Sequence, residues 1–259
     1  MTELFSFIAH RIAALSHPLA AITGGGGKTT LLYGLGRELA KTRRVLITTT
    51  TKIFYPAADE CSSVFVGETA ACRAYLAAAP RPALIAAGSV KDEKNKLHGY
   101  LPEEADYLSS CGAADYMIAE CDGSRGRSLK CYGNHEPPVP QSCGCVLAVA
   151  GVNALGKKAD EESIFRSEEF RAVYGLKNNA RLSESEYMKY LCAEDGPLKN
   201  APASADKILI LNQWELLPGD ERTRMRGIFP ALTERYDAVL CASERENILY
   251  EVTGKWKLK

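Results

Sequence analysis

The sequence predicts a three-layer α/β fold, in which a mostly parallel β-sheet lies between two layers of helices. Two observations favour it. Short apolar segments recur along the 259 residues without the strict polar–apolar alternation of strands that face water on one side. Longer segments with helical periodicity separate them, as expected when each parallel strand is followed by a crossover helix.

Eight segments are predicted to form the strands of this sheet: 19–23, 44–49, 63–67, 82–88, 115–123, 145–151, 207–212 and 238–243. Helices are predicted at 28–40, 68–79, 102–110, 160–175, 183–194 and 219–228. An amphipathic helix is expected at the N-terminus, where apolar residues recur at helical spacing, namely Leu4, Phe5, Ile8, Ile12 and Leu15. We expect one domain over residues 1–259, with a helical insertion at 152–206 that interrupts the rhythm of strands.

The composition is that of a folded protein without a bulk charge. Hydrophobic residues make up 46% of the chain, which is enough for a buried core. Lys plus Arg and Asp plus Glu number 32 each, and this balance argues against nucleic-acid binding driven by bulk electrostatics. No apolar run approaches the ~20 residues that cross a bilayer. We therefore expect a cytoplasmic protein with neither nucleic acid nor membrane as a partner.

Nine cysteines are present, and no two of them form a CxxC pair. Several lie in apolar segments such as 238–243, where a reduced cysteine acts as a small buried hydrophobe, so we expect core packing. The segment Cys143–Cys145, with Cys131 and His135 upstream, is an alternative metal or sulfur site. Its spacing matches no common zinc pattern.

A glycine-rich segment joins the first predicted strand to the helix that follows. Residues 24–30 read GGGGKTT. Glycine costs roughly 0.5–1 kcal/mol relative to alanine in regular structure, so four in succession indicate that backbone N–H groups must approach a ligand. Such groups at a helix N-terminus carry partial positive charge, which suits phosphate. A plain strand-to-helix turn is the alternative interpretation.

The loop is shorter than the usual G-x-x-x-x-G-K-[ST] pattern, because Ile22 stands where the first glycine is expected. We predict a tighter phosphate loop in a P-loop NTPase-like fold. Lys28 is expected on the β- and γ-phosphates of ATP or GTP, and the Thr29 hydroxyl on Mg²⁺. The predicted nucleotide-binding residues of the loop are Gly24, Gly25, Gly26, Gly27, Lys28, Thr29 and Thr30.

Polar residues also follow two other predicted strands, at the sheet edge where ligands bind in such folds. Residues 48–52 read TTTTK, which predicts a polar site facing the phosphates, with plain strand propensity as the alternative. Within it Thr50 is a predicted substrate contact and Lys52 a predicted catalytic residue. Glu120 and Asp122 lie where P-loop enzymes place acids that hold Mg²⁺ or orient water. Asp122 is predicted as a direct or second-sphere metal ligand, and Glu120 as a catalytic support or base. The predicted catalytic residues are thus Lys28, Lys52, Glu120 and Asp122. A plain Asp-Gly turn is the alternative interpretation of Asp122.

Further candidates follow these acids. Arg125, Arg127 and Lys130 are predicted to clamp an anionic substrate or the γ-phosphate, with ordinary solvated charges as the alternative. His135 and Glu136 precede two prolines that hold the backbone extended, and they are predicted substrate contacts, with a purely structural histidine as the equal alternative. Asn212 matches the first residue of the N-K-x-D element that reads guanine in GTPases, whereas Gln213 and Glu215 depart from it. Asn212 is a predicted nucleotide contact, with a helix cap as the alternative.

Four segments in this order resemble the YqeC family: GGGGKTT, TTTTKIFYP, AECDGSRGRSLKCYGNHEPPVP and GVNALGKK. The part from Glu120 to Pro140 is the most specific. The resemblance implies an accessory protein for selenium-dependent molybdenum hydroxylases, which acts on their cofactor and consumes nucleotide. Its implied partners are a molybdopterin-type cofactor and a hydroxylase client. Its implied site residues are Gly24–Thr30, Thr50, Lys52, Glu120, Asp122, Lys130, His135 and Glu136.

Three functions remain open on the sequence. The first is a Mg²⁺-dependent NTPase, or nucleotidyl or phosphoryl transferase, that matures a metal cofactor. The second is an ATP-dependent ligase, because ITGGGGKTT is similar to the GTNGKTT loop of Mur-type ligases. The third is a non-hydrolysing chaperone that binds nucleotide or cofactor as a switch.

Overall fold

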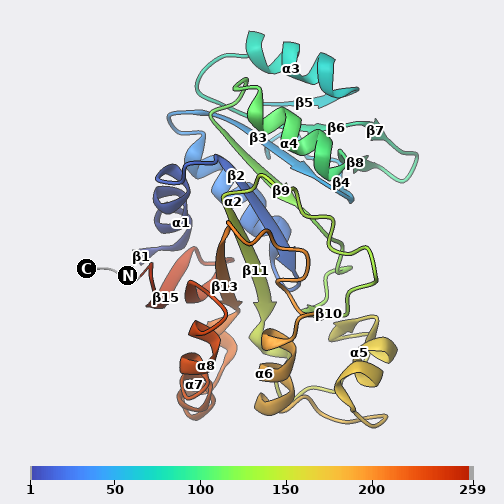
Figure 1. Ribbon diagram of the computed structural model, residues 1–259, viewed down its shortest axis with the longest axis vertical. Coiled ribbons are helices and arrows are strands. Elements are labelled where there is room, and N and C mark those ends of the chain that lie inside the picture. Colours follow the sequence, from blue (N-terminus) through green and yellow to red (C-terminus); the bar gives the residue numbers. More distant parts are fainter. Residues whose placement is uncertain (1, 257–259) are drawn as a thin grey trace.

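A ten-stranded sheet runs through the computed structural model, which describes residues 2–256 (Figure 1). Its strands lie in the order β1-β15-β14-β13-β11-β2-β9-β3-β6-β5. The eight from β14 to β5 are parallel, and β15 and β1 add an antiparallel edge. The strand bounds are β1 Thr2–Glu3, β2 Leu19–Gly24, β3 Arg44–Thr49, β5 Ser63–Val66, β6 Ala83–Gly88, β9 Tyr116–Glu120, β11 Cys145–Gly151, β13 Asp206–Asn212, β14 Ala238–Ser243 and β15 Ile248–Gly254.

Helices cover both faces of this sheet, because successive side chains of each strand point to opposite sides. Ala20 and Ile22 of β2 join the apolar cluster under α1 and α2, whereas Leu19 and Ala21 join the cluster on the other face. The second cluster includes residues of α3, α4, α5, α6, α7 and α8. The helix bounds are α1 Leu4–Ala13, α2 Lys28–Leu39, α3 Thr69–Ala78, α4 Pro102–Ser110, α5 Ser167–Tyr174, α6 Glu184–Cys192, α7 Gly219–Arg226 and α8 Phe229–Thr233.

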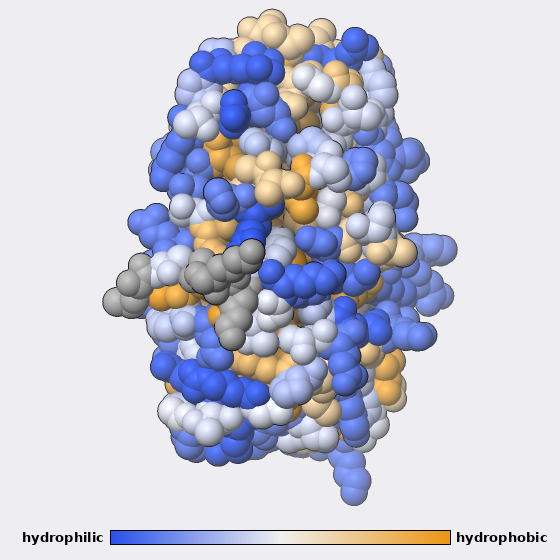
Figure 2. All heavy atoms as spheres, turned by 60° about the vertical axis from the view of Figure 1, so that its left-hand side comes forward, coloured by the Kyte–Doolittle hydropathy of each residue, from blue (hydrophilic) through white to orange (hydrophobic). Residues whose placement is uncertain are grey.

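Two small sheets and two short 3₁₀ helices complete the fold. Strands β4 (Lys52–Phe54), β8 (Lys96–His98) and β7 (Val90–Lys91) form an antiparallel sheet in that order, which we call the small sheet. Strand β10 (Leu129–Lys130) pairs with β12 (Ile164–Phe165). The 3₁₀ helices are η1 (Val152–Ala154) and η2 (Trp214–Leu216). On the face shown in Figure 2, apolar side chains are interspersed among hydrophilic ones.

The predicted α/β class and all eight predicted strands are confirmed, with ends that shift by a few residues. The strand predicted at 115–123 ends at Glu120, so Asp122 lies in the loop beyond it. The helix predicted at 160–175 is wrong over 160–166, where turns and β12 precede α5. There the Glu161 carboxylate accepts the Ser167 N–H at the start of α5, and Ile164 pairs with Leu129.

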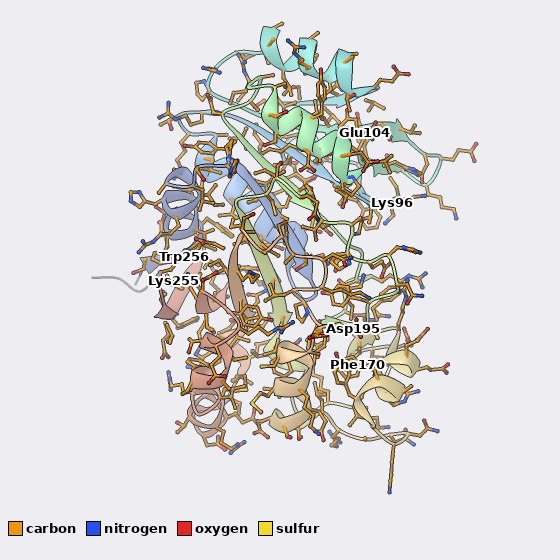
Figure 3. All side chains as sticks on the ribbon, viewed as in Figure 1. Lys96, Glu104, Phe170, Asp195, Lys255 and Trp256 are labelled. Carbon is orange, nitrogen blue, oxygen red and sulfur yellow. The ribbon has the colours of Figure 1, made fainter. Side chains whose placement is uncertain are left out.

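Residues 152–206 contain η1, β12, α5 and α6 and are therefore not purely helical. They pack on the same apolar cluster as the strands, through side chains such as Phe170, which is labelled in Figure 3. The Phe170 ring lies 5.4 Å from that of Tyr190. Within residues 2–256 no helix is both long and apolar enough to cross a membrane. All nine cysteines are unpaired thiols, six of them buried, and the described residues hold no group of three metal-ligating side chains.

Candidate functional site

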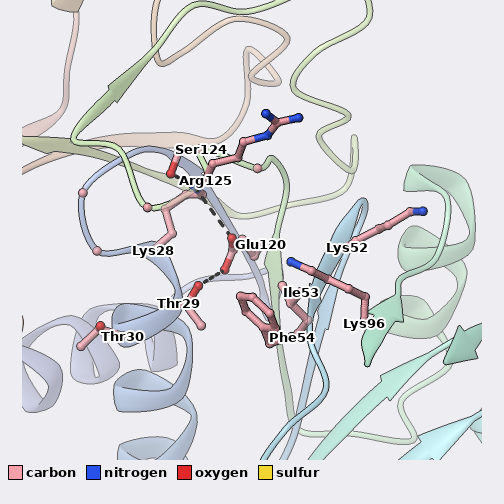
Figure 4. Close-up of a pocket in the computed structure, with 14 residues that line it drawn as sticks. Lys28, Thr29, Thr30, Lys52, Ile53, Phe54, Lys96, Glu120, Ser124 and Arg125 are labelled. Atoms are coloured by element: carbon pink, nitrogen blue, oxygen red, sulfur yellow. Dashed lines mark hydrogen bonds and ion pairs between the residues drawn. The ribbon is translucent and has the colours of Figure 1, made fainter. Parts of the chain in front are cut away.

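A cavity of about 330 Å³ opens at the carboxyl ends of β2 and β9. Its floor is the glycine loop and the first turn of α2, and its opposite wall belongs to the small sheet (Figure 4). The residues that line it are Gly26, Gly27, Lys28, Thr29, Thr30, Lys52, Ile53, Phe54, Lys96, Glu120, Gly123, Ser124, Arg125 and Gly126. The cavity thus joins the loop, the strand end and the small sheet.

The four glycines of the loop are required by close contacts. A Cβ on Gly24, whose φ is +99°, would lie 2.0 Å from the Val149 carbonyl oxygen. A Cβ on Gly27 would lie 1.8 Å from a carboxylate oxygen of Glu244. Within residues 2–256 no backbone carbonyl accepts a hydrogen bond from the N–H groups of residues 26–30. The loop is therefore folded tightly, and the open N–H groups at the start of α2 are available to a ligand.

Lys28 is buried and turned back onto the loop. Its Nζ donates to the Gly24 carbonyl at 2.7 Å and to Ser124 Oγ at 3.3 Å, and lies 3.2 Å from Asp122 Oδ1 and 3.9 Å from Glu120 Oε1. Burial by itself lowers the pKa of Lys28, but the carboxylates of Asp122 and Glu120 outweigh it and raise that pKa above the ordinary value. The ammonium group is therefore charged at neutral pH.

The two acids take different positions around this lysine. Glu120 lines the cavity, and its Oε2 accepts a hydrogen bond from the Thr29 hydroxyl at 3.0 Å. Burial raises the pKa of Glu120. Asp122 lies behind it, where its Oδ2 accepts the Gly24 N–H at 3.1 Å. Its Oδ1 accepts no hydrogen bond from residues 2–256 and faces the ammonium group of Lys28.

A chain of ion pairs leads from Asp122 away from the cavity. Lys130 is fully buried, with its Nζ 3.6 Å from Asp122 Oδ2 and 3.2 Å from Glu136 Oε2. Glu136 is in turn held by both terminal nitrogens of Arg166, at 2.8 and 3.1 Å. Partial burial opposes ionisation of Glu136, but Lys130 above all lowers its pKa. Lys130 and Glu136, predicted to bind substrate, thus lie outside the cavity lining and pair with each other.

The remaining predicted substrate residues are scattered. Lys52 and Arg125 line the cavity, but Figure 4 shows both side chains directed away from Glu120. The guanidinium of Arg125 lies 5.1 Å from the ring centroid of Phe165. The Thr50 hydroxyl donates to the Pro138 carbonyl at 2.7 Å, and His135 is exposed and apart from the cavity lining. The structure therefore does not bring these residues together at one point.

Asn212 lies under the phosphate-loop candidate. Its Nδ2 donates to the Gly26 carbonyl at 2.6 Å and to Glu244 Oε2 at 3.0 Å, and its Oδ1 accepts the Glu244 N–H at 2.9 Å. Burial raises the pKa of Glu244 to about 8. Asn212 and Glu244 therefore support the loop from below, joining the ends of β13 and β14 to it.

Sequence reasoning missed Glu244, Ser124, Phe54 and Lys96. Glu244 directly follows the segment 238–243, so its place beyond a strand end was a usable signal. Phe54 and Lys96 face each other across β4 and β8, with the Lys96 ammonium 3.6 Å from the centroid of the Phe54 ring. That pairing joins segments 42 positions apart in the sequence and is visible only in the fold.

Gly27→Ala is expected to lower the melting temperature by roughly 4 °C or more, because the new methyl group meets Glu244 and Asn212 at a φ of +146°. Gly123→Ala is the matched control, since a Cβ there has no neighbour within 4 Å. Thermal unfolding followed by circular dichroism measures both. Equal melting temperatures of the two variants would show that the loop is not tightly packed.

Glu244→Gln is expected to stabilise the protein increasingly as the pH rises from 5 to 9. The folded-state pKa of Glu244 is about 8 and its ordinary value 4.5, so the folded protein binds the extra proton in this window and wild-type stability falls with rising pH. The amide cannot ionise and escapes this loss. Melting temperatures across the range test it, with the exposed Glu246→Gln as control. A stability difference independent of pH would contradict the assignment.

Comparisons with known proteins agree on one family. The family model described as "YqeC protein" matches residues 20–168, a range that contains every residue lining the cavity. The "Uncharacterized protein YqeC" of Escherichia coli (strain K12) is 35% identical over 195 residues, which cover 75% of this chain and 75% of the relative. No solved structure matches. The chain therefore belongs to the YqeC family.

Proposed function

We propose that this protein binds a nucleoside triphosphate with Mg²⁺ in a shortened P-loop and uses it in phosphoryl or nucleotidyl chemistry. The observation that carries this proposal is the meeting of four features at one cavity. These are the open N–H groups of residues 26–30, the buried charged Lys28, the Thr29 hydroxyl and the acids at the end of β9. Phosphate bound to such a helix N-terminus is favoured by hydrogen bonds and by the helix dipole together.

Bound phosphates would replace some of the internal partners that the Lys28 ammonium group has in this structure. Its Nζ bonds to the Gly24 carbonyl and lies between two carboxylates, so a bound phosphate offers it an oxygen acceptor of the same charge as those carboxylates. Gly26 and Gly27 line the cavity and leave room for the phosphate at the backbone. The glycine run thus serves both tight folding and access.

Mg²⁺ fits the donor set on one side of the loop. The Thr29 hydroxyl and Glu120 Oε2 are already hydrogen-bonded, and both are hard oxygen donors of the kind that Mg²⁺ prefers. Asp122, one layer behind, orients Lys28 and the loop and suits a second-sphere role. Mg²⁺ bound there would neutralise charge on the β- and γ-phosphates during transfer. Glu120 is in addition the carboxylate that lines the cavity.

Of the described contacts, only those of Asn212 bear on the choice between ATP and GTP. Asn212 is engaged with Gly26 and Glu244, and this favours a role in supporting the loop over direct contact with the base. The work of this chemistry, in our proposal, is the maturation of a molybdopterin-type cofactor for a selenium-dependent molybdenum hydroxylase. That setting rests on the resemblance of the motifs, and the residues of the cavity support the nucleotide part of it.

Lys28→Ala is expected to weaken Mg-ATP or Mg-GTP binding about 10- to 100-fold, because a charge-assisted hydrogen bond to phosphate is lost. Titration calorimetry measures the affinity, and circular dichroism checks that the variant folds. Lys41→Ala, in the turn that follows α2, is the control, because its side chain is exposed. Unchanged affinity in a folded Lys28→Ala protein would refute the nucleotide site.

Turnover assays separate an NTPase, a transferase and a non-hydrolysing switch. Release of phosphate without a second substrate supports an NTPase, and formation of an adduct between nucleotide and cofactor supports transfer. Nucleotide binding without turnover, in the presence of cofactor and client, supports the switch.

A further inference from the structure

The wall of the cavity opposite the loop has a composition that a phosphate site alone does not need. It is made by the small sheet, which contributes Lys52, Ile53 and Phe54 from β4 and Lys96 from β8. Phe54 is 69% exposed although it lines a cavity. A large exposed aromatic ring in such a place offers apolar contact area to a ligand.

Lys96 is the cation that enters the cavity from this wall. In Figure 4 its ammonium group is directed toward Glu120, whereas the side chains of Lys52 and Arg125 point outward. It lies 3.6 Å from the centre of the Phe54 ring, and its charge contributes to the environment of Glu120. The positive charge of Lys96 thus lies beside the Phe54 ring, on the side of Glu120 that faces away from the glycine loop.

The positive charge of the cavity is divided between the loop and the small sheet. Four cationic side chains and one carboxylate line it. Lys28, at the loop, is paired with Glu120 and with Asp122 behind it. Lys96, on the small sheet, is a separate positive charge that faces Glu120 from the other side (Figure 4).

We propose that the β4–β8 wall is a subsite for a second ligand, a compound with an anionic group attached to a flat ring. Lys96 receives the anionic group, Phe54 contacts the ring, and Lys52 and Arg125 supply positive charge at the rim. The register of the small sheet sets this arrangement, because Phe54 and Lys96 are directly opposed across β4 and β8. This subsite rests on the proposed function for its place beside the phosphates, and adds to it the class of the second ligand.

Two phosphate esters serve as probes, 1-naphthyl phosphate with a flat ring and methyl phosphate without one. Titration calorimetry with wild-type protein, with and without saturating Mg-ADP, is expected to show the naphthyl ester binding about fivefold or more tightly than the methyl ester. Phe54→Ala is expected to abolish this preference. Lys96→Gln is expected to weaken both esters about fivefold or more, because a charged donor is removed.

Exposed residues elsewhere give matched controls. Lys94→Gln, in the turn between β7 and β8, and Tyr107→Ala, on α4, are expected to leave both affinities unchanged. Equal binding of the two esters to wild type, failure of both to bind, or a ring preference that survives in Phe54→Ala would overturn the subsite.

The same titrations keep the two proposals apart. If Mg-ADP does not bind to wild type, the nucleotide function fails, while the ester affinities without nucleotide still decide the subsite. If Mg-ADP binds equally well to wild type, Phe54→Ala and Lys96→Gln, and the esters show no ring preference, the subsite alone fails.

Discussion

The buried carboxylate of Asp122 is the group on which the rest of the candidate site depends. It lies between the ammonium groups of Lys28 and Lys130 and accepts the N–H of Gly24. Removing one partner of a buried ion pair commonly costs roughly 3–5 kcal/mol, because the other charge stays desolvated. This carboxylate therefore holds the loop, its lysine and the end of β9 together.

The same carboxylate links the cavity to a distant part of the chain. Charges alternate in sign from Lys28 through Asp122, Lys130 and Glu136 to Arg166, which precedes α5. Each of the three inner groups in this series of ion pairs has a partner of opposite sign on both sides, which offsets the cost of burying it. Residues 152–206 are thereby connected to the loop by charge as well as by the shared apolar cluster.

The parallel strands could be predicted because burial on both faces gives continuous apolar segments, such as 145–151 and 207–212. Edge strand β15 was missed because its polar and apolar residues are mixed, and its exposure is correspondingly uneven. Strands of the small sheet are only two or three residues long, and their pairing is decided by tertiary contacts. Helical periodicity at 160–166 was overridden by the pairing of β12 with β10.

The candidate site divides in the same way. Lys28, Thr29, Glu120 and Asp122 could be predicted to meet, because adjacent parallel strands β2 and β9 bring their carboxyl ends to one edge. Lys52 was predicted to act in catalysis because it follows a strand of the main sheet. Lys52 instead begins β4, where its side chain points away from Glu120, and the side chain of Lys96 in β8 points toward Glu120 (Figure 4). Such an exchange depends on the register of two short strands, which no local pattern reveals.

In the proposed function, Thr29 and the acids beside it make nucleotide binding depend on Mg²⁺. The most direct measurement is the affinity for ATP and GTP with Mg²⁺ and with EDTA, in wild type, Thr29→Val and Thr30→Val. Both threonines are exposed on the first turn of α2, so the substitutions are closely matched. Mg²⁺ is expected to tighten binding to wild type and Thr30→Val by about tenfold or more, and Thr29→Val is expected to lose most of this gain. Equal affinity with Mg²⁺ and with EDTA in the wild-type protein would contradict it.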